Sequence, residues 1–401
     1  MGQPSYLFQE YTVTKGLFAG PEIRGFDQGH SDKLKGMASS CRPTENSAPV
    51  ALTGRRPDGS PAGFLRRCLV SQLRQDPTTK EWVIIATERS KRPHNFARPE
   101  TKAEKPPYKE DCPFCQGNEH LTPHESLAYR SGGPADSAGW WVRVVPNRFP
   151  ALSSDGSLQR QELGFFRMMD GVGVHEVVIE SPLHNEILPF MEDRQVEEIL
   201  LAYRERYLAL REDRTIKLII IFKNHGEGAG TSLEHTHSQI VATAVVPSDV
   251  RRRLDEAARH YDDHGTCVYC DSVREELAFG KRIVMDTERF VVLQSFAPRY
   301  PFETWIIPKE HQASFGLISM EDSKKLARVL KDTLLRLYSK LNDPDYNYVI
   351  RTAPVRDEQE DYYHWHLQII PRLTTLAGFE MGSGMYINVC LPEETARYLR
   401  E

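Results

Sequence analysis

The sequence has no hydrophobic run that is long enough to cross a bilayer. Its longest apolar stretch, around Leu218–Phe222, has the length of a β-strand, whereas a spanning helix needs about 20 apolar residues. The first 30 residues also lack the basic and then apolar pattern of a secretory signal. We therefore expect a cytoplasmic protein that has no membrane partner.

An excess of positive charge is also missing. The chain carries 51 Lys and Arg against 56 Asp and Glu, which gives a formal net charge of -5. Proteins that bind nucleic acid through a broad surface usually make that surface basic. We therefore expect no nucleic-acid partner, but a compact basic pocket for a small phosphorylated ligand is compatible with this charge.

A disulfide framework is not expected, because the seven cysteines are an odd number in a large chain that we place in the cytoplasm. Four of the seven form two Cys-x-x-Cys pairs, Cys112–Cys115 and Cys267–Cys270. This spacing lets one tight turn supply two thiolate ligands to a zinc ion. The grouping therefore indicates metal binding.

Residues 1–66 differ from the rest of the chain. They are rich in Gly, Pro, Ser and charged residues and lack a sustained hydrophobic period, so we expect a disordered N-terminal tail. The globular pattern begins near Leu73, where a turn at 76–79 precedes the expected strand Trp82–Ile85.

An internal repeat organises the remainder of the chain. Each half contains, in the same order, a Cys-x-x-Cys pair, a strand, a lone histidine, a helix, a second strand and a His-x-His-x-Gln motif. The lone histidine and the motif are 51 residues apart in the first half (His184 to His235) and 53 apart in the second (His311 to His364). We predict an α+β fold in which two duplicated halves, 67–248 and 249–401, form one large unit of antiparallel sheets with packed helices.

Each Cys-x-x-Cys pair can be completed by two histidines of its own half. The repeated order favours two Cys2His2 zinc sites over ordinary thiols and histidines, and the sites are expected to be structural because protein would fill all four positions. The predicted ligands are Cys112, Cys115, His184 and His235 in the first half, and Cys267, Cys270, His311 and His364 in the second.

The first His-x-His-x-Gln motif suggests a nucleophile. Side chains alternate along a strand, so His235, His237 and Gln239 are expected on one face. A glycine-rich stretch at 224–232 precedes them and can present backbone N–H groups to an anion. A neutral imidazole can attack phosphorus while such donors stabilise the oxygens, which favours phosphoryl or nucleotidyl transfer through His237.

The two motifs resemble those of the histidine-triad superfamily, and the duplication resembles its galactose-1-phosphate uridylyltransferase branch, from about Leu73 to Arg400. The resemblance implies two histidine-triad-like halves and a homodimer. Supporting segments are Arg74–Val83, Glu88–Pro93, Val144–Leu152, Tyr300–Glu303 and Gly378–Glu380.

This resemblance implies a ping-pong reaction in which His237 attacks a nucleotide sugar, carries the nucleotidyl group and passes it to a second phosphorylated partner. It also implies that His366, which occupies the slot of His237 in the second half, is structural or lines the pocket. The other implied site residues are Ser232, Gln239 and Asn224 on phosphate oxygens, Arg89 and Arg92 near the phosphates, Asn147 and Phe149 on the nucleoside, and Glu380 on the sugar hydroxyls.

The chain departs from the best-known uridylyltransferases in several places. Thr236 stands where they have proline, and Arg253 and Arg351 fall where they have ligands of a second metal. The His-x-His-Ser-Gln motif and the Tyr386–Asn388 stretch are similar to a sister group that includes plant ADP-glucose phosphorylases. The resemblance to the uridylyltransferases makes UDP-glucose and galactose 1-phosphate the leading substrates. The similarity to the sister group gives the alternative, which is adenylyl transfer from ADP-glucose to phosphate.

Two other functional classes remain open. A nucleotide hydrolase of the same superfamily would be a short chain with a single motif that has histidine at the third position, and Gln239 instead favours transfer over hydrolysis. A zinc-stapled binding module without catalysis would also explain both Cys-x-x-Cys pairs. It would need basic or aromatic stripes near them, and residues 108–111 are mixed in charge.

Overall fold

The computed structural model describes residues 70–86, 96 and 104–401. The predicted tail 1–66 lies outside these residues, and so do the predicted phosphate-binding residues Arg89 and Arg92. The described residues all belong to one compact unit. No helix of the described part is long and apolar enough to cross a membrane.

A ten-stranded sheet dominates the described chain, and every neighbouring pair in it is antiparallel. Both halves contribute strands to it, so the predicted α+β fold with antiparallel pairing is confirmed. In sheet order the strands are β10 (Ile283–Asp286), β11 (Phe290–Leu293), β12 (Thr304–Pro308), β14 (His366–Pro371), β13 (Tyr346–Arg351), β8 (Leu218–His225), β9 (His237–Thr243), β7 (Gly173–Ile179), β4 (Trp140–Pro146) and β3 (Leu127–Arg130).

The two halves meet where β8 pairs with β13, in a register that places Asn224 opposite Asn347. Moving outward from this junction, each half presents its strands in an equivalent order, so β9 corresponds to β14 and β7 to β12. The duplication read from the sequence is therefore visible as one continuous sheet. This arrangement brings residues of the second half beside the first His-x-His-x-Gln motif.

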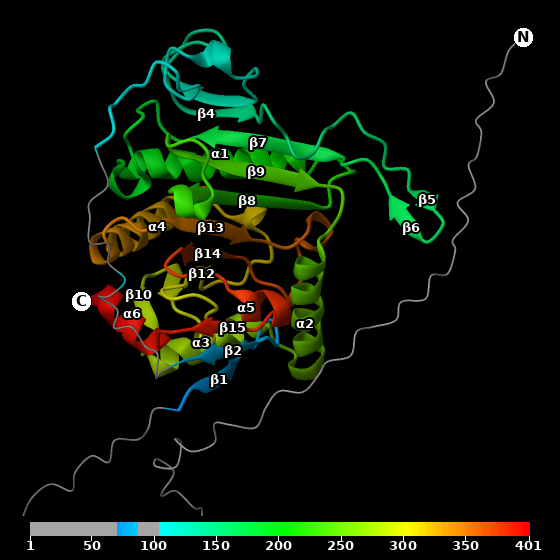
Figure 1. Ribbon diagram of the computed structural model, residues 1–401, viewed down its shortest axis with the longest axis vertical. Coiled ribbons are helices and arrows are strands. Elements are labelled where there is room, and N and C mark those ends of the chain that lie inside the picture. The colour runs from blue at the N-terminus through cyan, green and yellow to red at the C-terminus, as the bar shows by residue number, and fades with distance from the viewer. Residues whose placement is uncertain (1–69, 87–95, 97–103) are drawn as a thin grey trace, which may run out of the picture. The chain divides into compact units, whose positions relative to one another are not determined.

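Two long helices cover one face of the sheet, α1 (Asp193–Leu210) and α4 (Met320–Leu341) (Figure 1). Each lies between the lone histidine and the second strand of its half, where the repeat predicts a helix. Along α1 the buried side chains recur at three- and four-residue intervals, as at Val196, Ile199 and Tyr203, and they pack on the apolar side chains of the strands. At the start of α4, Ser319 accepts a hydrogen bond from the Asp322 amide (3.0 Å), which satisfies one of the free N–H groups of the first turn.

The expected turn at 76–79 joins β1 (Gln72–Gln75) to β2 (Trp82–Ile85) in a three-stranded sheet, in which β2 also pairs in parallel with β15 (Tyr386–Asn388). A separate two-stranded hairpin of β5 (Gln161–Leu163) and β6 (Phe166–Met168) extends away from the large sheet (Figure 1). The remaining elements are α2 (Ser248–His264), α3 (Val268–Phe279), α5 (Gly378–Ser383), α6 (Pro392–Arg400) and the 3-10 turns η3 (Glu119–Leu121), η4 (Leu188–Phe190), η5 (Glu227–Ala229), η6 (Phe315–Leu317) and η7 (Val355–Asp357).

Candidate active site and metal centres

His237 is the first residue of β9 and is 6% exposed. Its Nδ1 lies 2.8 Å from the carbonyl oxygen of His235, an arrangement in which Nδ1 carries the proton and donates it to that oxygen. Burial lowers the pKa of His237, so the imidazole is neutral near pH 7. Within the described chain no group forms a hydrogen bond with Nε2, whose lone pair can therefore act on a ligand.

Gln239 lies two residues beyond His237 on the same face of β9 and is half-buried. Its Oε1 is 2.8 Å from Nε2 of His175, and the Ala151 amide donates to the other ring nitrogen of His175 (3.2 Å). His175 therefore donates from Nε2 and orients the Gln239 side chain, which leaves the amide N–H groups of Gln239 for a ligand. Asn147 Nδ2 also lies 3.2 Å from His175 Nε2, so the structure brings Asn147 and Gln239 together.

The sequence singled out no role for His175. It stands at the beginning of the strand that leads to the lone His184, with no motif around it. Its position on β7 opposite Val241, on the face that carries Gln239, identifies it only after the register of β7 and β9 is known.

The glycine-rich stretch predicted to bind phosphate forms a tight turn after β8. Gly226 has a φ of 84°, and a Cβ added there would lie 1.8 Å from a carboxylate oxygen of Asp345, so the loop needs glycine at this point. The same carboxylate accepts a hydrogen bond from the Gly228 amide (2.9 Å). Ser232 is exposed beyond this turn. Asp345 belongs to the second half, which therefore fixes the loop of the first.

A second residue of the other half, Asn347, holds Asn224. Asn347 Nδ2 donates both to Asn224 Oδ1 (2.7 Å) and to the carbonyl oxygen of Ala229 (2.9 Å). Arg372 donates in turn to Asn347 Oδ1 (2.5 Å). Asn347 and Arg372 were not predicted, because only the β8–β13 junction places them beside the glycine-rich loop.

Two predicted ligand-binding residues lie on exposed segments. The Phe149 ring is 83% exposed, and its amide donates to Asn147 Oδ1 (2.9 Å). Glu380 lies in the first turn of α5, where its carboxylate accepts a hydrogen bond from the Ala377 amide (3.1 Å). The contacts of the described residues tie Phe149 to Asn147, but they do not join Glu380 to the His237 region.

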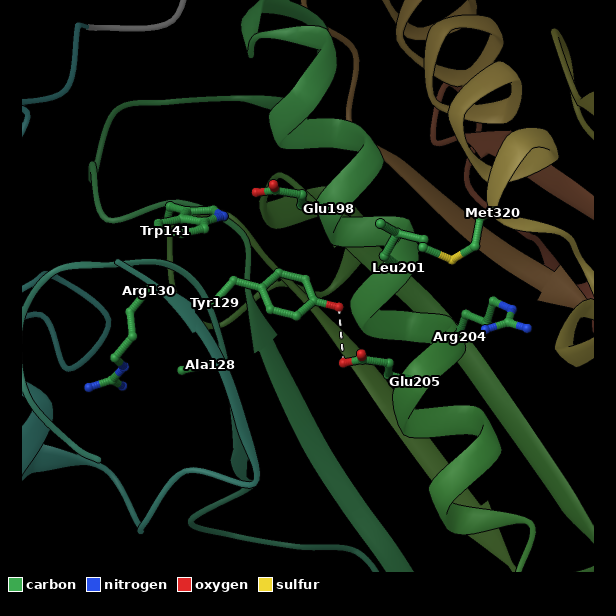
Figure 2. A pocket seen from close by; sticks show the side chains of 9 residues that line it. All are labelled: Ala128, Tyr129, Arg130, Trp141, Glu198, Leu201, Arg204, Glu205 and Met320. Atoms are coloured by element: carbon green, nitrogen blue, oxygen red, sulfur yellow. Dashed lines mark hydrogen bonds between the residues drawn. The ribbon is translucent and has the colours of Figure 1, made fainter. Parts of the chain in front are cut away.

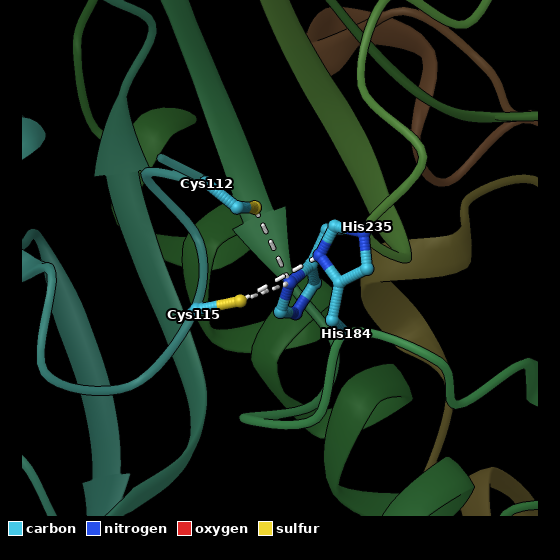
Figure 3. Close-up of side chains that lie close together, drawn as sticks. All are labelled: Cys112, Cys115, His184 and His235. Carbon is cyan, nitrogen blue, oxygen red and sulfur yellow. Dashed lines mark hydrogen bonds between the residues drawn. The ribbon is translucent and has the colours of Figure 1, made fainter. Parts of the chain in front are cut away.

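Four predicted metal ligands of the first half come together as one buried cluster, Cys112, Cys115, His184 and His235 (Figure 3). Cys115 Sγ lies 3.6 Å from Nδ1 of both histidines, and Cys112 Sγ lies 3.6 Å from Nδ1 of His235. With Zn–S near 2.3 Å and Zn–N near 2.05 Å, a tetrahedral zinc site separates sulfur and nitrogen by about 3.6 Å. The donor set and its spacing therefore fit zinc.

The protonation of this cluster also suits a metal. His235 Nε2 lies 2.8 Å from the Ser181 carbonyl oxygen, to which it donates its proton, so Nδ1 is free to ligate. Burial lowers the pKa of His235 to about 4 and raises the pKa of Cys112 to about 11. A cation in the cluster would convert the Cys112 thiol to a thiolate, so metal binding is expected to release protons.

Phe114, between the two cysteines, links this cluster to the nucleophile. Its ring meets the His237 ring edge to face, with centroids 5.2 Å apart, and meets the His235 ring in the same way at 6.1 Å. The loop that carries the thiols therefore also forms one wall beside His237.

The second cluster contains three of its four predicted ligands, Cys267, Cys270 and His311. Cys270 Sγ lies 3.3 Å from His311 Nδ1. His364 is not brought into this group, because both of its ring nitrogens face the backbone: Nδ1 accepts from the Gln312 amide (2.9 Å) and Nε2 lies 2.8 Å from the Pro308 carbonyl oxygen. The His-x-His spacing alone could not reveal this backbone pairing.

The second His-x-His-x-Gln motif is closed. His366 is 1% exposed and stacks on Trp305, with centroids 4.4 Å apart, and burial lowers its pKa well below the ordinary value. Arg351 donates to Gln368 Oε1 (2.9 Å), and Gln368 donates to Glu303 (2.7 Å). Gln239 of the first motif is half-buried, whereas His366 and Gln368 of the second are both buried, so the second motif is the more enclosed of the two.

A cavity of about 420 Å³ lies elsewhere, between β3, β4 and α1 (Figure 2). Tyr129 and Trp141 line it together with Glu198 and Glu205, and the Tyr129 hydroxyl donates to Glu205 (3.0 Å). None of the predicted site residues is among its lining residues, so its size does not make it the candidate active site.

Two family models match the chain. The one described as galactose-1-phosphate uridyl transferase, N-terminal domain, matches residues 63–247, and the one described as galactose-1-phosphate uridyl transferase, C-terminal domain, matches residues 253–388.

Among curated relatives, an ADP-glucose phosphorylase of Arabidopsis thaliana is 39% identical over 337 residues, which cover 82% of this chain and 92% of the relative. A galactose-1-phosphate uridylyltransferase of Thermotoga maritima is 32% identical over 340 residues, which cover 82% and 98%. Among solved structures, an Arabidopsis thaliana ADP-glucose phosphorylase with bound ADP-glucose aligns with a TM-score of 0.69 at 35% identity, covering 83% of this chain and 99% of that chain. A uridylyltransferase structure aligns with a TM-score of 0.64 at 28% identity, covering 82% and 98%.

Proposed function

Because the chain belongs to the galactose-1-phosphate uridyl transferase family, we propose that it is a nucleotidyltransferase in which His237 carries the nucleoside monophosphate. The observation that supports this role best is the state of the His237 ring. Its Nδ1–H is engaged by the His235 carbonyl oxygen at 2.8 Å, and its Nε2 faces no hydrogen-bond partner of the described chain. This state of the ring is the one that a histidine nucleophile requires, with one nitrogen oriented by a hydrogen bond and the other available to a ligand.

In the first half-reaction, Nε2 of His237 bonds to the α-phosphorus of a nucleotide sugar. The bond from that phosphorus to the bridging oxygen breaks, and the sugar phosphate leaves with the electron pair. The ring then carries positive charge, which the hydrogen bond from Nδ1 to the His235 carbonyl oxygen stabilises. In the second half-reaction, an oxygen of a phosphorylated acceptor attacks the same phosphorus and the imidazole leaves as a neutral ring. The histidine needs no proton transfer in either step.

The residues around His237 would orient the phosphates. Gln239, held by His175, and Asn224, held by Asn347, keep amide donors in fixed positions. The turn at 226–230 is anchored by Asp345, and Ser232 follows it. Preorganised donors of this kind stabilise charge on the equatorial oxygens without rearranging during the reaction. Arg89 and Arg92 remain proposed phosphate ligands, and Glu380 remains a proposed sugar ligand.

We propose ADP-glucose as the nucleotide sugar and inorganic phosphate as the acceptor. Three observations support this choice. The relative named ADP-glucose phosphorylase is 39% identical, against 32% for the Thermotoga maritima uridylyltransferase. The structure with bound ADP-glucose aligns at 35% identity, against 28% for the uridylyltransferase structure. The His-x-His-Ser-Gln motif and residues 386–388 also resemble the phosphorylase group.

Uridylyl transfer between UDP-glucose and galactose 1-phosphate is the second candidate. It is supported by the two matching family models and by the uridylyltransferases among the relatives. Both candidates use the same nucleophile and differ only in the base and the acceptor.

An activity panel separates the two candidates. ADP-glucose and UDP-glucose are each incubated with inorganic phosphate or with galactose 1-phosphate, and the nucleotide products are measured by chromatography. We expect the highest kcat/KM for ADP-glucose with phosphate, which yields ADP and glucose 1-phosphate. Preferred turnover of UDP-glucose with galactose 1-phosphate would favour the second candidate, and no turnover in any combination would contradict both.

Zinc is the metal that we propose for the two clusters. The first would be held by two thiolates and two imidazoles, and the second by Cys267, Cys270 and His311. Bound zinc would crosslink the loops around the site.

A homodimer in the cytoplasm remains the expected assembly and location. Light scattering of the purified protein would test the assembly, and cell fractionation would test the location.

A further inference from the structure

A fully buried ion pair lies beneath the strand that carries the proposed nucleophile. Glu180 directly follows β7 and Lys223 belongs to β8, and β9 runs between these two strands. The ammonium group of Lys223 contacts the Glu180 carboxylate, and the two side chains are 1% and 0% exposed. The pair lies on the helix-covered face of the sheet, opposite to the face that carries Gln239.

Three consecutive residues, 236–238, form hydrogen bonds with this pair, and His237 is the middle one. Lys223 Nζ donates to the His237 carbonyl oxygen (3.1 Å) and to Thr236 Oγ1 (2.9 Å). Thr236 donates to one oxygen of Glu180 (2.6 Å), and Ser238 donates to the other. The backbone on both sides of the nucleophile is therefore tied to one charged centre.

The carboxylate also connects the strand to the helix layer. The Tyr203 hydroxyl of α1 donates to Glu180 Oε1 (3.2 Å) and lies 2.6 Å from the hydroxyl of Tyr348 on β13. Burial alone would raise the pKa of Glu180, but the Lys223 charge and the hydroxyl donors lower it below its ordinary value. The carboxylate is therefore ionised and accepts hydrogen bonds from three elements.

Such a pair is a poor source of stability. Removing two charges from water is unfavourable by several kcal/mol per ion, and apolar residues of similar volume often replace a buried pair without loss of stability. The position of the pair therefore calls for another explanation. A nucleophile must reach phosphorus within a narrow geometry, and an error of about 1 Å can lower the rate by about 100-fold.

We propose that Glu180 and Lys223 are positioning residues for His237, which hold residues 236–238 so that the imidazole stays aligned with the α-phosphorus. The inference rests on the proposed function, because it takes His237 as the group that bonds to phosphorus. Neither residue touches the substrate. They instead fix the carbonyl oxygen of His237 and the backbone from which its imidazole projects.

The test measures the single-turnover rate at which labelled nucleotide from ADP-glucose becomes bound to the protein. The double variant Glu180→Gln/Lys223→Met removes both charges together and keeps an acceptor oxygen for Ser238 and Tyr203. We expect its labelling rate, per folded molecule, to fall by about 100-fold. Its dissociation constant for ADP-glucose and its zinc content are expected to stay near the wild-type values.

The matched control is the ion pair between Glu176 on the same strand and Arg206 of α1, which is also largely buried. Glu176→Gln/Arg206→Met removes two charges from the same face of β7 without touching residues 236–238. We expect this variant to label at the wild-type rate per folded molecule. Equal rates in the two double variants would overturn the inference, because the Glu180–Lys223 pair would then be only structural.

Should the first double variant not fold, Thr236→Val tests the same link with a smaller change. It removes the hydroxyl that contacts both Glu180 and Lys223 and keeps the side-chain volume. A labelling rate lowered about 10-fold with unchanged ADP-glucose affinity supports the inference, and a wild-type rate contradicts it. Absence of label on the wild-type protein with either nucleotide sugar would instead contradict the proposed function.

Discussion

At the scale of single residues, Gly226 and Gly230 share a positive φ, 84° and 83°, but their ψ values are 159° and 25° and their surroundings differ. A Cβ at Gly226 would meet the Asp345 carboxylate at 1.8 Å, whereas a Cβ at Gly230 would meet nothing within 4 Å. Gly226 therefore combines a conformation that essentially only glycine adopts with a close approach to Asp345, whereas Gly230 lies in the left-handed region with open space around it.

We expect Gly226→Ala to be the more harmful of the two substitutions. Alanine at 226 bears the larger backbone strain and must also displace Asp345, so the free energy of unfolding of Gly226→Ala should be about 1–3 kcal/mol lower than that of Gly230→Ala. Urea unfolding of both variants measures this difference. Equal stabilities would contradict the combined effect of strain and clash at Gly226.

The candidate site also shows what single residues in a sequence can and cannot reveal. Cys112, Cys115, His184 and His235 were predicted together because the Cys-x-x-Cys spacing and the order of the repeat are visible in the chain. His175 was missed, because its role depends on the strand register that places it on the same face as Gln239. Spacing along the sequence identifies candidate metal ligands, but contacts between side chains on neighbouring strands depend on how the strands pair.

At the scale of elements, the Cys112–Cys115 loop joins the candidate metal cluster to the proposed nucleophile His237 through Phe114. We expect Cys115→Ser to lose about one zinc per chain and to lower both the thermal midpoint and the rate at which His237 is labelled. Elemental analysis, thermal unfolding and labelling measure these three quantities.

The control for the metal count is Cys390→Ala. Cys390 is buried but belongs to neither cluster, so the variant should keep the zinc content of the wild type while losing some packing. A Cys115→Ser protein that retained the full wild-type zinc content would contradict the assignment of the first cluster.

The first turn of helix α2 contains Asp249, whose carboxylate should make the stability of the protein depend on pH. Burial of Asp249 opposes ionisation, but Arg253 and Arg252 outweigh it and lower the pKa of Asp249 to about 2 from 3.8. A carboxylate with a depressed pKa in the folded state stabilises the protein above about pH 4, and this contribution is lost as the pH falls from about 4 toward 2.

Asp249→Asn isolates this contribution. The side chain is 47% exposed, so solvent screening reduces the expected effect to about 1 kcal/mol at pH 7. The difference in unfolding free energy between wild type and variant should shrink from pH 7 to pH 3, as measured by urea unfolding at both values. A difference that stayed constant across this range would exclude Asp249 as its source.

At the scale of the whole molecule, the duplication could be predicted because the two halves repeat the same motifs in the same order. The continuous sheet through β8 and β13 could not, since no local pattern specifies which strands meet at the junction. The two halves contribute differently around this junction. In the second half His366 stacks on Trp305, while Asp345 and Asn347 of the same half hold the glycine-rich loop of the first.

The proposed function requires His237 to form a covalent bond to the α-phosphorus. Wild-type protein and the His237→Asn variant are incubated with ADP-glucose or UDP-glucose labelled in the α-phosphate, and acid-labile label on the protein is located by peptide mapping. We expect label on the peptide that contains His237 in the wild type and at least about 1,000-fold less in the variant. Label of equal amount on the His237→Asn protein, or label located on another residue, would contradict it.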